Sequence, residues 1–147
     1  MIDKIIDAVA NALHTEYATY KIYTERVKQG LIEPCFYISV IDSTRKRVHT
    51  NRYLENNNFD ILYFPLKSEN NSEMQSVAND LYYVCEFISM DDNKFKGFDM
   101  KHQIIDGVLH FFVSYNLYLT KALTVDDLGY SENMEDLTYN IGVESGE

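Results

Sequence analysis

The residues best suited by type to do chemistry are two histidines in one apolar segment, HQIIDGVLHFFVSYNLYL (residues 102–119). His102 and His110 lie either side of Asp106, and imidazole and carboxylate groups together can bind a metal ion or move protons. Asp106-Gly107, however, favours a two-residue type I′ turn between paired strands. In that hairpin the two imidazoles point to opposite faces. We therefore predict that they share no metal ion and are packed or solvated side chains.

No other segment carries a catalytic or ligand-binding motif. The six glycines are scattered, so they form neither a phosphate-cradling loop nor a dinucleotide fingerprint. There is no Gly-x-Ser-x-Gly elbow, no Cys-x-x-Cys pair and no histidine pair spaced for a helical zinc site. Cys35 and Cys85 each lie in an apolar run, where cysteine usually packs as a small hydrophobe. We predict no catalytic residue, no cofactor and no metal.

Length and charge indicate one domain with an acidic end. A chain of 147 residues with 46% hydrophobic residues can bury one substantial core, which we place in residues 1–122. From Asp126 onward there are seven acids and no base, which leaves 16 of the 23 acids and all 13 bases in residues 1–125. Direct nucleic-acid recognition needs net positive charge and is not expected. No signal peptide or membrane span is apparent, so we expect a protein of the reducing cytoplasm.

The expected fold class is α+β. Residues 2–13 have the apolar spacing of an amphipathic helix, and a second helix is predicted to begin at Ser72, which has capping-box spacing with Gln75. Runs rich in β-branched and aromatic residues predict strands at residues 20–25, at 35–41 and on both sides of Asp106-Gly107. We expect a mixed or mostly antiparallel sheet with two main helices packed on it.

Residues 45–64 are predicted to form a long β-hairpin. The run RKRVHTNRYLE leads into Asn56, Asn57 and Asn58, and FDILYF returns to Pro65. Asparagine tolerates the positive φ angles of tight turns, so these three residues are the expected tip. Arms of about ten residues would reach about 33 Å. We expect this long β-hairpin to project from the domain.

The one local cluster of positive charge lies on this hairpin. Arg45, Lys46, Arg47 and Arg52 supply four of the 13 basic residues, and Tyr53 is adjacent. Such charges commonly solvate an exposed strand edge and deter unwanted pairing between sheets. Contact with an acidic surface of another subunit or partner is an equal alternative. These five residues and the three asparagines are therefore candidates for a subunit or partner interface.

The acidic C-terminal extension, residues 123–147, contains a strand pattern of its own. Leu137, Tyr139, Ile141 and Val143 alternate with polar or small residues. An added strand here could pair with an exposed sheet edge of a neighbour, so these four residues are further interface candidates.

Three segments, taken in order, resemble one family of small proteins from tailed phages and prophages. They are YKIYTERVKQGLIEPCFYISVI, RYLENNNFDILYFP and IIDGVLHFFVSYN, within which GLIEPCFYI and DGVLHFFV are the most diagnostic. The family is that of the phage tail terminator proteins, also called tail completion or tail-to-head joining proteins. The likeness covers residues 1–120. It implies a sheet packed against helices and assembly as a ring, typically a hexamer, that caps the finished tail tube and presents a surface to the head connector.

The resemblance makes a structural role in the virion the first hypothesis. The implied partners are further copies of the chain, the tail tube protein, the head-tail connector or neck protein and, if the tail is contractile, the sheath protein. The implied location is the tail or neck of the virion, after assembly in the host cytoplasm and without a membrane. A head-completion or neck adaptor is the alternative within the same particle. A small-ligand or enzymatic module is a third hypothesis, which would require a concave pocket with converging polar groups, for example His102 or His110 with Asp99.

Overall fold

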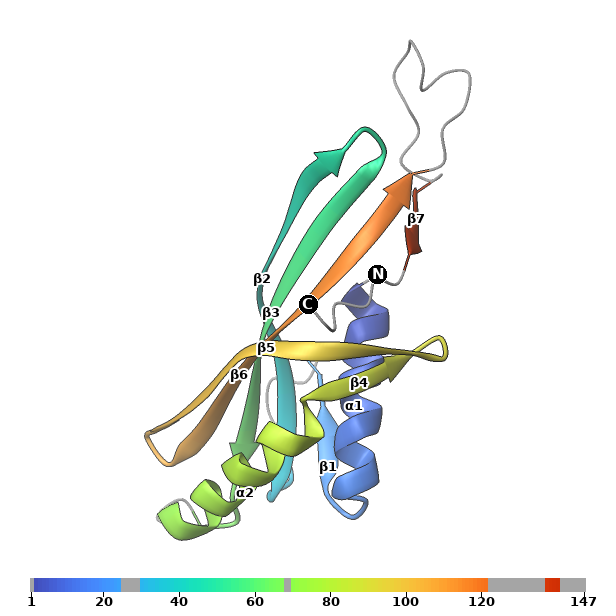
Figure 1. The fold of residues 1–147 in the computed structure, drawn as a ribbon. Coiled ribbons are helices and arrows are strands. Elements are labelled where there is room, and N and C mark those ends of the chain that lie inside the picture. Colours follow the sequence, from blue (N-terminus) through green and yellow to red (C-terminus); the bar gives the residue numbers. More distant parts are fainter. Residues whose placement is uncertain (1, 25–29, 68–69, 122–136, 141–147) are drawn as a thin grey trace.

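The structure is a computed structural model that describes residues 2–24, 30–67, 70–121 and 137–140. Two helices, α1 (Ile2–Glu16) and α2 (Asn71–Val84), pack against a curled sheet (Figure 1). The strands are β1 (Lys21–Tyr23), β2 (Cys35–His49), β3 (Arg52–Phe64), β4 (Phe87–Met90), β5 (Asn93–Ile105), β6 (Val108–Lys121) and β7 (Leu137–Asn140). The order is β1-β2-β3-β6-β5-β4, with β7 paired to β6. Only the β1–β2 pair is parallel, so the sheet is mixed and the predicted α+β class is confirmed.

Helix α1 forms where its apolar periodicity predicted it. The side chains of Ile5, Val9 and Leu13 are at most 1% exposed, because one face of the helix packs into the core. Asp3 lies in the first turn, where the positive end of the helix dipole favours a carboxylate. Figure 1 shows α1 alongside β1 and β4, at one side of the sheet.

The N-cap of helix α2 lies two residues before the predicted one. The N-cap is Asn70, whose side-chain oxygen accepts a hydrogen bond from the Glu73 amide at 3.1 Å and whose amide group donates to the Glu73 carboxylate at 2.9 Å. The prediction that placed the cap at Ser72 and Gln75 was wrong. Asparagine caps as well as serine does, and the Asn70–Glu73 pair has the same spacing.

The hairpin between β2 and β3 turns at a different place from the one predicted. His49 pairs with Arg52, so the turn is at Thr50 and Asn51, and residues 56–58 lie inside β3. The prediction that Asn56, Asn57 and Asn58 form the tip was therefore wrong.

The asparagines fit a strand because both of its neighbouring strands pair with it and because the side chains of Asn57 and Asn58 bind residues far away in the sequence. β3 pairs with β2 on one side and with β6 on the other, which engages its backbone. Asn57 accepts a hydrogen bond from the Ser43 hydroxyl at 2.6 Å, and Asn58 donates to Asp42 at 2.6 Å. The long projecting hairpin is not confirmed, because β6 runs beside β3 from Arg52 to Tyr63.

The β5–β6 hairpin has the predicted turn, and the predicted register holds from the turn back to Lys101 but not to Met100, whose predicted pairing with Val113 does not form. Asp106 and Gly107 have φ angles of 52° and 76°, as a type I′ turn requires. Along β6, every second residue from Leu109 to Leu119 is buried against the helices, and the residues between them face the other side of the sheet.

β5 bends in its middle, and this bend curls the sheet. The pairing with β6 shifts between Phe98 and Lys101, and Asp99 has a positive φ of 55°. The first half of β5, with β4, consequently turns toward α1, as Figure 1 shows. The buried side chains of Ile88, Met90 and Phe95 then join the core.

Candidate assembly surface

The two histidines lie in separate environments on opposite faces of the sheet, as predicted. His102 is beside α2, with Nδ1 2.9 Å from the Tyr82 hydroxyl and Nε2 3.0 Å from the Gln75 side-chain oxygen. His110 is on the helix-free face, with Nδ1 2.8 Å from Asp60 Oδ2. Among the described residues, no group of three or more His, Cys, Asp or Glu side chains is arranged to hold a metal ion.

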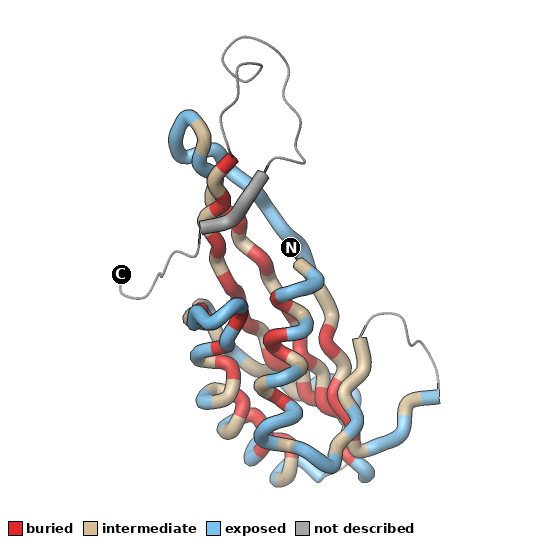
Figure 2. Tube along the Cα trace, turned by 90° about the vertical axis from the view of Figure 1, so that its right-hand side faces the viewer, coloured by how far each residue is buried: buried red, intermediate tan, exposed pale blue. Residues whose placement is uncertain are grey.

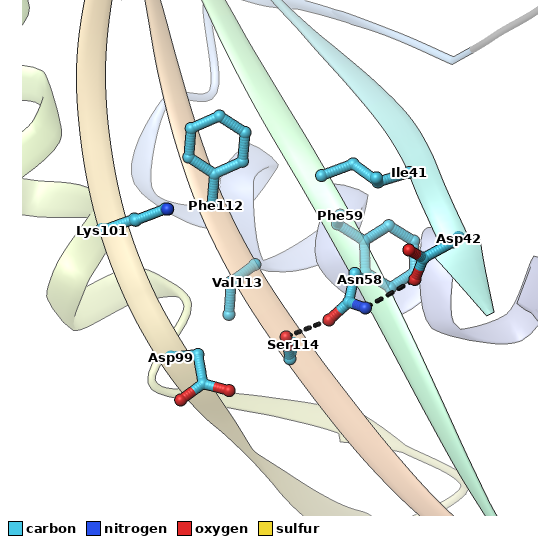
Figure 3. A pocket seen from close by; sticks show the side chains of 9 residues that line it. All are labelled: Ile41, Asp42, Asn58, Phe59, Asp99, Lys101, Phe112, Val113 and Ser114. Atoms are coloured by element: carbon cyan, nitrogen blue, oxygen red, sulfur yellow. Dashed lines mark hydrogen bonds between the residues drawn. The ribbon is translucent and has the colours of Figure 1, made fainter. Parts of the chain in front are cut away.

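A shallow depression of about 370 Å³ lies on the helix-free face (Figure 3). Asp42, Asn58, Asp99, Lys101 and Ser114 are the polar side chains that line it. Asn58 bridges two strands, because its amide nitrogen donates to Asp42 and its oxygen accepts from the Ser114 hydroxyl. The depression is lined by Asp99 but by neither His102 nor His110, so that example of a catalytic set does not form there.

The Asp60–His110 pair makes this face sensitive to pH. The Asp60 side chain is 16% exposed, and this burial raises the pKa of its carboxyl group. The hydrogen bond and charge of His110 act in the opposite direction and offset the burial only in part. A carboxyl group whose pKa is raised by folding favours the folded state most when it is protonated, and this contribution is lost as pH rises through the folded pKa.

We expect the free energy of unfolding of Asp60→Asn, compared with that of wild type, to increase as pH rises. The increase begins at about pH 3.9, the pKa of an unfolded Asp, and ends above the raised pKa of folded Asp60. The amide has no charge to desolvate, so only the wild type loses stability across this window. Urea unfolding of both proteins at a series of pH values measures the difference. Asp106→Asn, at the exposed β5–β6 turn, controls for the loss of one negative charge. A difference that is constant or falls with pH would contradict the assignment.

The outer half of the sheet carries most of the predicted interface residues. Here β2, β3, β6 and β7 lie side by side, and we call this part, made of residues 42–60, 113–121 and 137–140, the ribbon. Along its β2 border every residue from Ile41 to Thr50 is exposed, as the continuous pale-blue stretch in Figure 2 shows. β1 covers β2 only at Cys35–Tyr37, and no described strand pairs with the border from Asp42 to His49.

The four basic residues do not form one patch. Arg45 and Arg47 point to the face that bears the helices, where Arg45 pairs with Glu55 and Arg47 lies 5.4 Å from the ring centre of Tyr53. Lys46 alternates with them along β2 and points to the helix-free face. Arg52 also lies on that face, 4.9 Å from the ring centre of Tyr118. The period-two alternation of a strand could have predicted this division.

Arg45 and Asn57 belong to a polar network within the subunit. Glu55 accepts from Arg45 Nη2 at 2.8 Å and from Asn57 Nδ2 at 3.3 Å, and Asn57 is 0% exposed. Asn56 lies on the other face, opposite Asn116 of β6. Leu137 and Tyr139 lie in β7, whereas Ile141 and Val143 fall outside the described residues. Arg45 forms an ion pair, and Arg47 and Arg52 lie over tyrosine rings. Lys46 is exposed, and it is the one of these four cations with no ion pair, side-chain hydrogen bond or ring contact to another described residue.

Comparisons with known proteins identify the family. The family model described as phage tail terminator protein matches residues 4–127, well over half of the chain. One solved structure, whose name carries no functional description, is 12% identical to this chain with a TM-score of 0.44. The match covers 84% of this chain and 98% of that one, and a likeness this distant shows nothing about function. No curated protein matches. Within the described residues, no helix is long and apolar enough to cross a membrane. The chain therefore belongs to the phage tail terminator family, a family of structural proteins of the phage tail.

Proposed function

We propose that copies of this chain close into a ring, with six subunits, that terminates the tail tube and provides the joint to the head connector. The observation that carries the proposal is an exposed strand border, Asp42–His49, in a chain of the tail terminator family. An exposed edge offers backbone N–H and C=O groups to another chain. Contacts that join a different surface on each copy generate closed rings when the rotation between the copies closes.

The proposed partners follow from that position. One side of the ring contacts the tail tube protein, the other contacts the head-tail connector or neck protein, and the sheath protein touches the ring if the tail is contractile. Assembly takes place in the host cytoplasm. The work is done by shape and by contact between chains, without catalysis. Of the polar side chains that line the depression on the helix-free face, Asp42, Asn58 and Ser114 are hydrogen-bonded to one another, which supports this part of the proposal.

We expect native mass spectrometry of the full chain to give a hexamer, either alone or after addition of the tail tube protein, and electron microscopy to show rings at one end of the tubes. Both measurements are made at physiological salt, because charged contacts at exposed edges weaken as ionic strength rises. A protein that stays monomeric in both conditions, and that decorates neither end of the tube, would refute the proposal.

A further inference from the structure

The ribbon has two open borders, and they are formed by different strands at the same level of the sheet. On one side is β2, and on the other is β7, which pairs only with β6 among the described strands. The pairings run straight across: Arg47 pairs with Tyr53, Tyr53 with Leu119 and Leu119 with Tyr139. Figure 1 shows the same arrangement, with β2 and β7 at opposite borders of the upper part of the molecule.

The strand directions allow these two borders to pair with each other between copies. Each of the three pairings within the ribbon is antiparallel, so β7 runs opposite to β2. When a second copy is placed beside the first in the same orientation, its β2 meets the first copy's β7 as an antiparallel neighbour. The sheet would then continue from one subunit to the next without a change in pairing type.

Charge favours this pairing over pairing of like borders. The β2 border carries Arg45, Lys46 and Arg47, and two such borders side by side would set like charges opposite each other, which is destabilising. The four residues of β7 are uncharged, but Glu135 and Asp136 precede them directly and Glu144 follows. The β2 border is basic and β7 has acidic residues next to it in the sequence, so the charges of the two segments are complementary. A β2–β7 contact also avoids placing two basic β2 borders side by side.

We propose that β7 of each subunit pairs with the Asp42–His49 border of β2 in the next subunit, so that the ribbons form one continuous sheet around the assembly. This inference rests on the proposed ring and specifies its interface. It gives β7 a role: it is the strand that the basic border of a neighbouring copy receives. Lys46, which is exposed on that border, lies level with Asn140 of β7 across the ribbon, two residues from Thr138. When a second copy is placed beside the first, its Lys46 therefore lies near this part of the first copy's β7.

The test is a cross-link between chains in assembled rings. Two versions of the full chain with one added cysteine each, Lys46→Cys and Thr138→Cys, are mixed, allowed to assemble and treated with a short bis-maleimide. Because each cysteine is on a different polypeptide, any product that joins residues 46 and 138 must bridge two subunits. Tryptic mass spectrometry of the dimer band identifies the joined peptides. We expect this product to dominate the cross-linked material.

The native cysteines do not interfere. Cys35 and Cys85 are both 0% exposed, and burial raises the pKa of Cys35 to about 11 and that of Cys85 to about 12. A maleimide reacts with accessible thiolates, so both stay silent in the folded chain. The matched control mixes Lys46→Cys with Gln103→Cys, which places the second thiol at an exposed position of β5, outside the ribbon.

Three further outcomes are informative. Rings in native mass spectra without the 46–138 product would overturn the β2–β7 interface and leave the proposed ring intact. A 46–103 product in place of the 46–138 product would also overturn it, because the β2 border would then face another part of the neighbour. If no ring forms with or without tube protein, the proposed function fails and this interface fails with it.

Discussion

Gly97→Ala is expected to lower the free energy of unfolding by about 3 kcal/mol, at the upper end of what overpacking costs in a close-packed core. Gly97 lies at the bend of β5, where its amide donates to the Glu86 carbonyl at 2.7 Å. A Cβ atom there would be 2.6 Å from the Cys85 carbonyl oxygen and 2.8 Å from a methyl group of Val113. The oxygen belongs to the backbone, which cannot rotate away, so β5 would have to move from α2. Thermal unfolding should show a Tm lower by about 10 °C.

Gly30→Ala is the matched control. Gly30 has a φ of 80°, which costs an alanine about 1–2 kcal/mol, but a Cβ atom there meets nothing within 4 Å. We therefore expect a smaller loss of stability than at Gly97, caused by backbone strain alone. Equal losses at both positions would show that the close approach of β5 to Cys85 does not limit this fold.

The elements that could be predicted from the sequence are those fixed by local rules. The apolar stripe of α1 specifies a buried face by its spacing alone, and the stripe from Met74 to Leu81 does the same for α2. Asp106-Gly107 fixes both a turn and the register of the strands beside it, since a two-residue loop allows one pairing. That register places His102 and His110 on opposite faces of the sheet, as predicted.

The β2–β3 turn could not be predicted in the same way, because it depends on distant pairing. Three asparagines in a row have the local signature of a turn. What keeps them in a strand is β6, whose pairing partner for Asn56 is Asn116, sixty residues later in the chain. The Ser114 hydroxyl, also on β6, binds the Asn58 side chain. No rule based on neighbouring residues contains that information.

That the basic candidate residues lie on an exposed strand could be predicted from the sequence, whereas the partners of their side chains could not. The positive charges do lie on an exposed strand, but strand alternation sends Arg45 and Lys46 to opposite faces. Alternation is readable from the sequence. The partner of Arg45 is not, because Glu55 is brought opposite it only by the register of the β2–β3 pair. Which cation stabilises the subunit and which is left exposed on its border is therefore decided by tertiary structure.

Arg45→Ala is expected to destabilise the folded subunit by about 2 kcal/mol, whereas Lys46→Ala changes its stability by less than about 0.5 kcal/mol. The Glu55 side chain is only 10% exposed, and Arg45 Nη2 lies 2.8 Å from it. Removal of the guanidinium group leaves a nearly buried carboxylate with Asn57 as its remaining hydrogen-bond donor. Lys46 is the next residue on the same strand and has the same charge, so it is the matched control. Urea unfolding of the two variants measures the difference.

A second substitution identifies the cause of the loss. If the cost of Arg45→Ala comes from the uncompensated charge on Glu55, then Glu55→Gln in the same chain should recover part of it, because a neutral amide is cheaper to bury than a lone carboxylate. The four proteins of this double-mutant cycle give the coupling energy directly. A coupling near zero, or equal losses for Arg45→Ala and Lys46→Ala, would mean that Arg45 does not stabilise the subunit through Glu55. A strong coupling would show that Arg45 stabilises the folded subunit through Glu55. The neighbouring cation, Lys46, is exposed on the border, so the effects of Lys46 variants on assembly can then be measured without a change in folding.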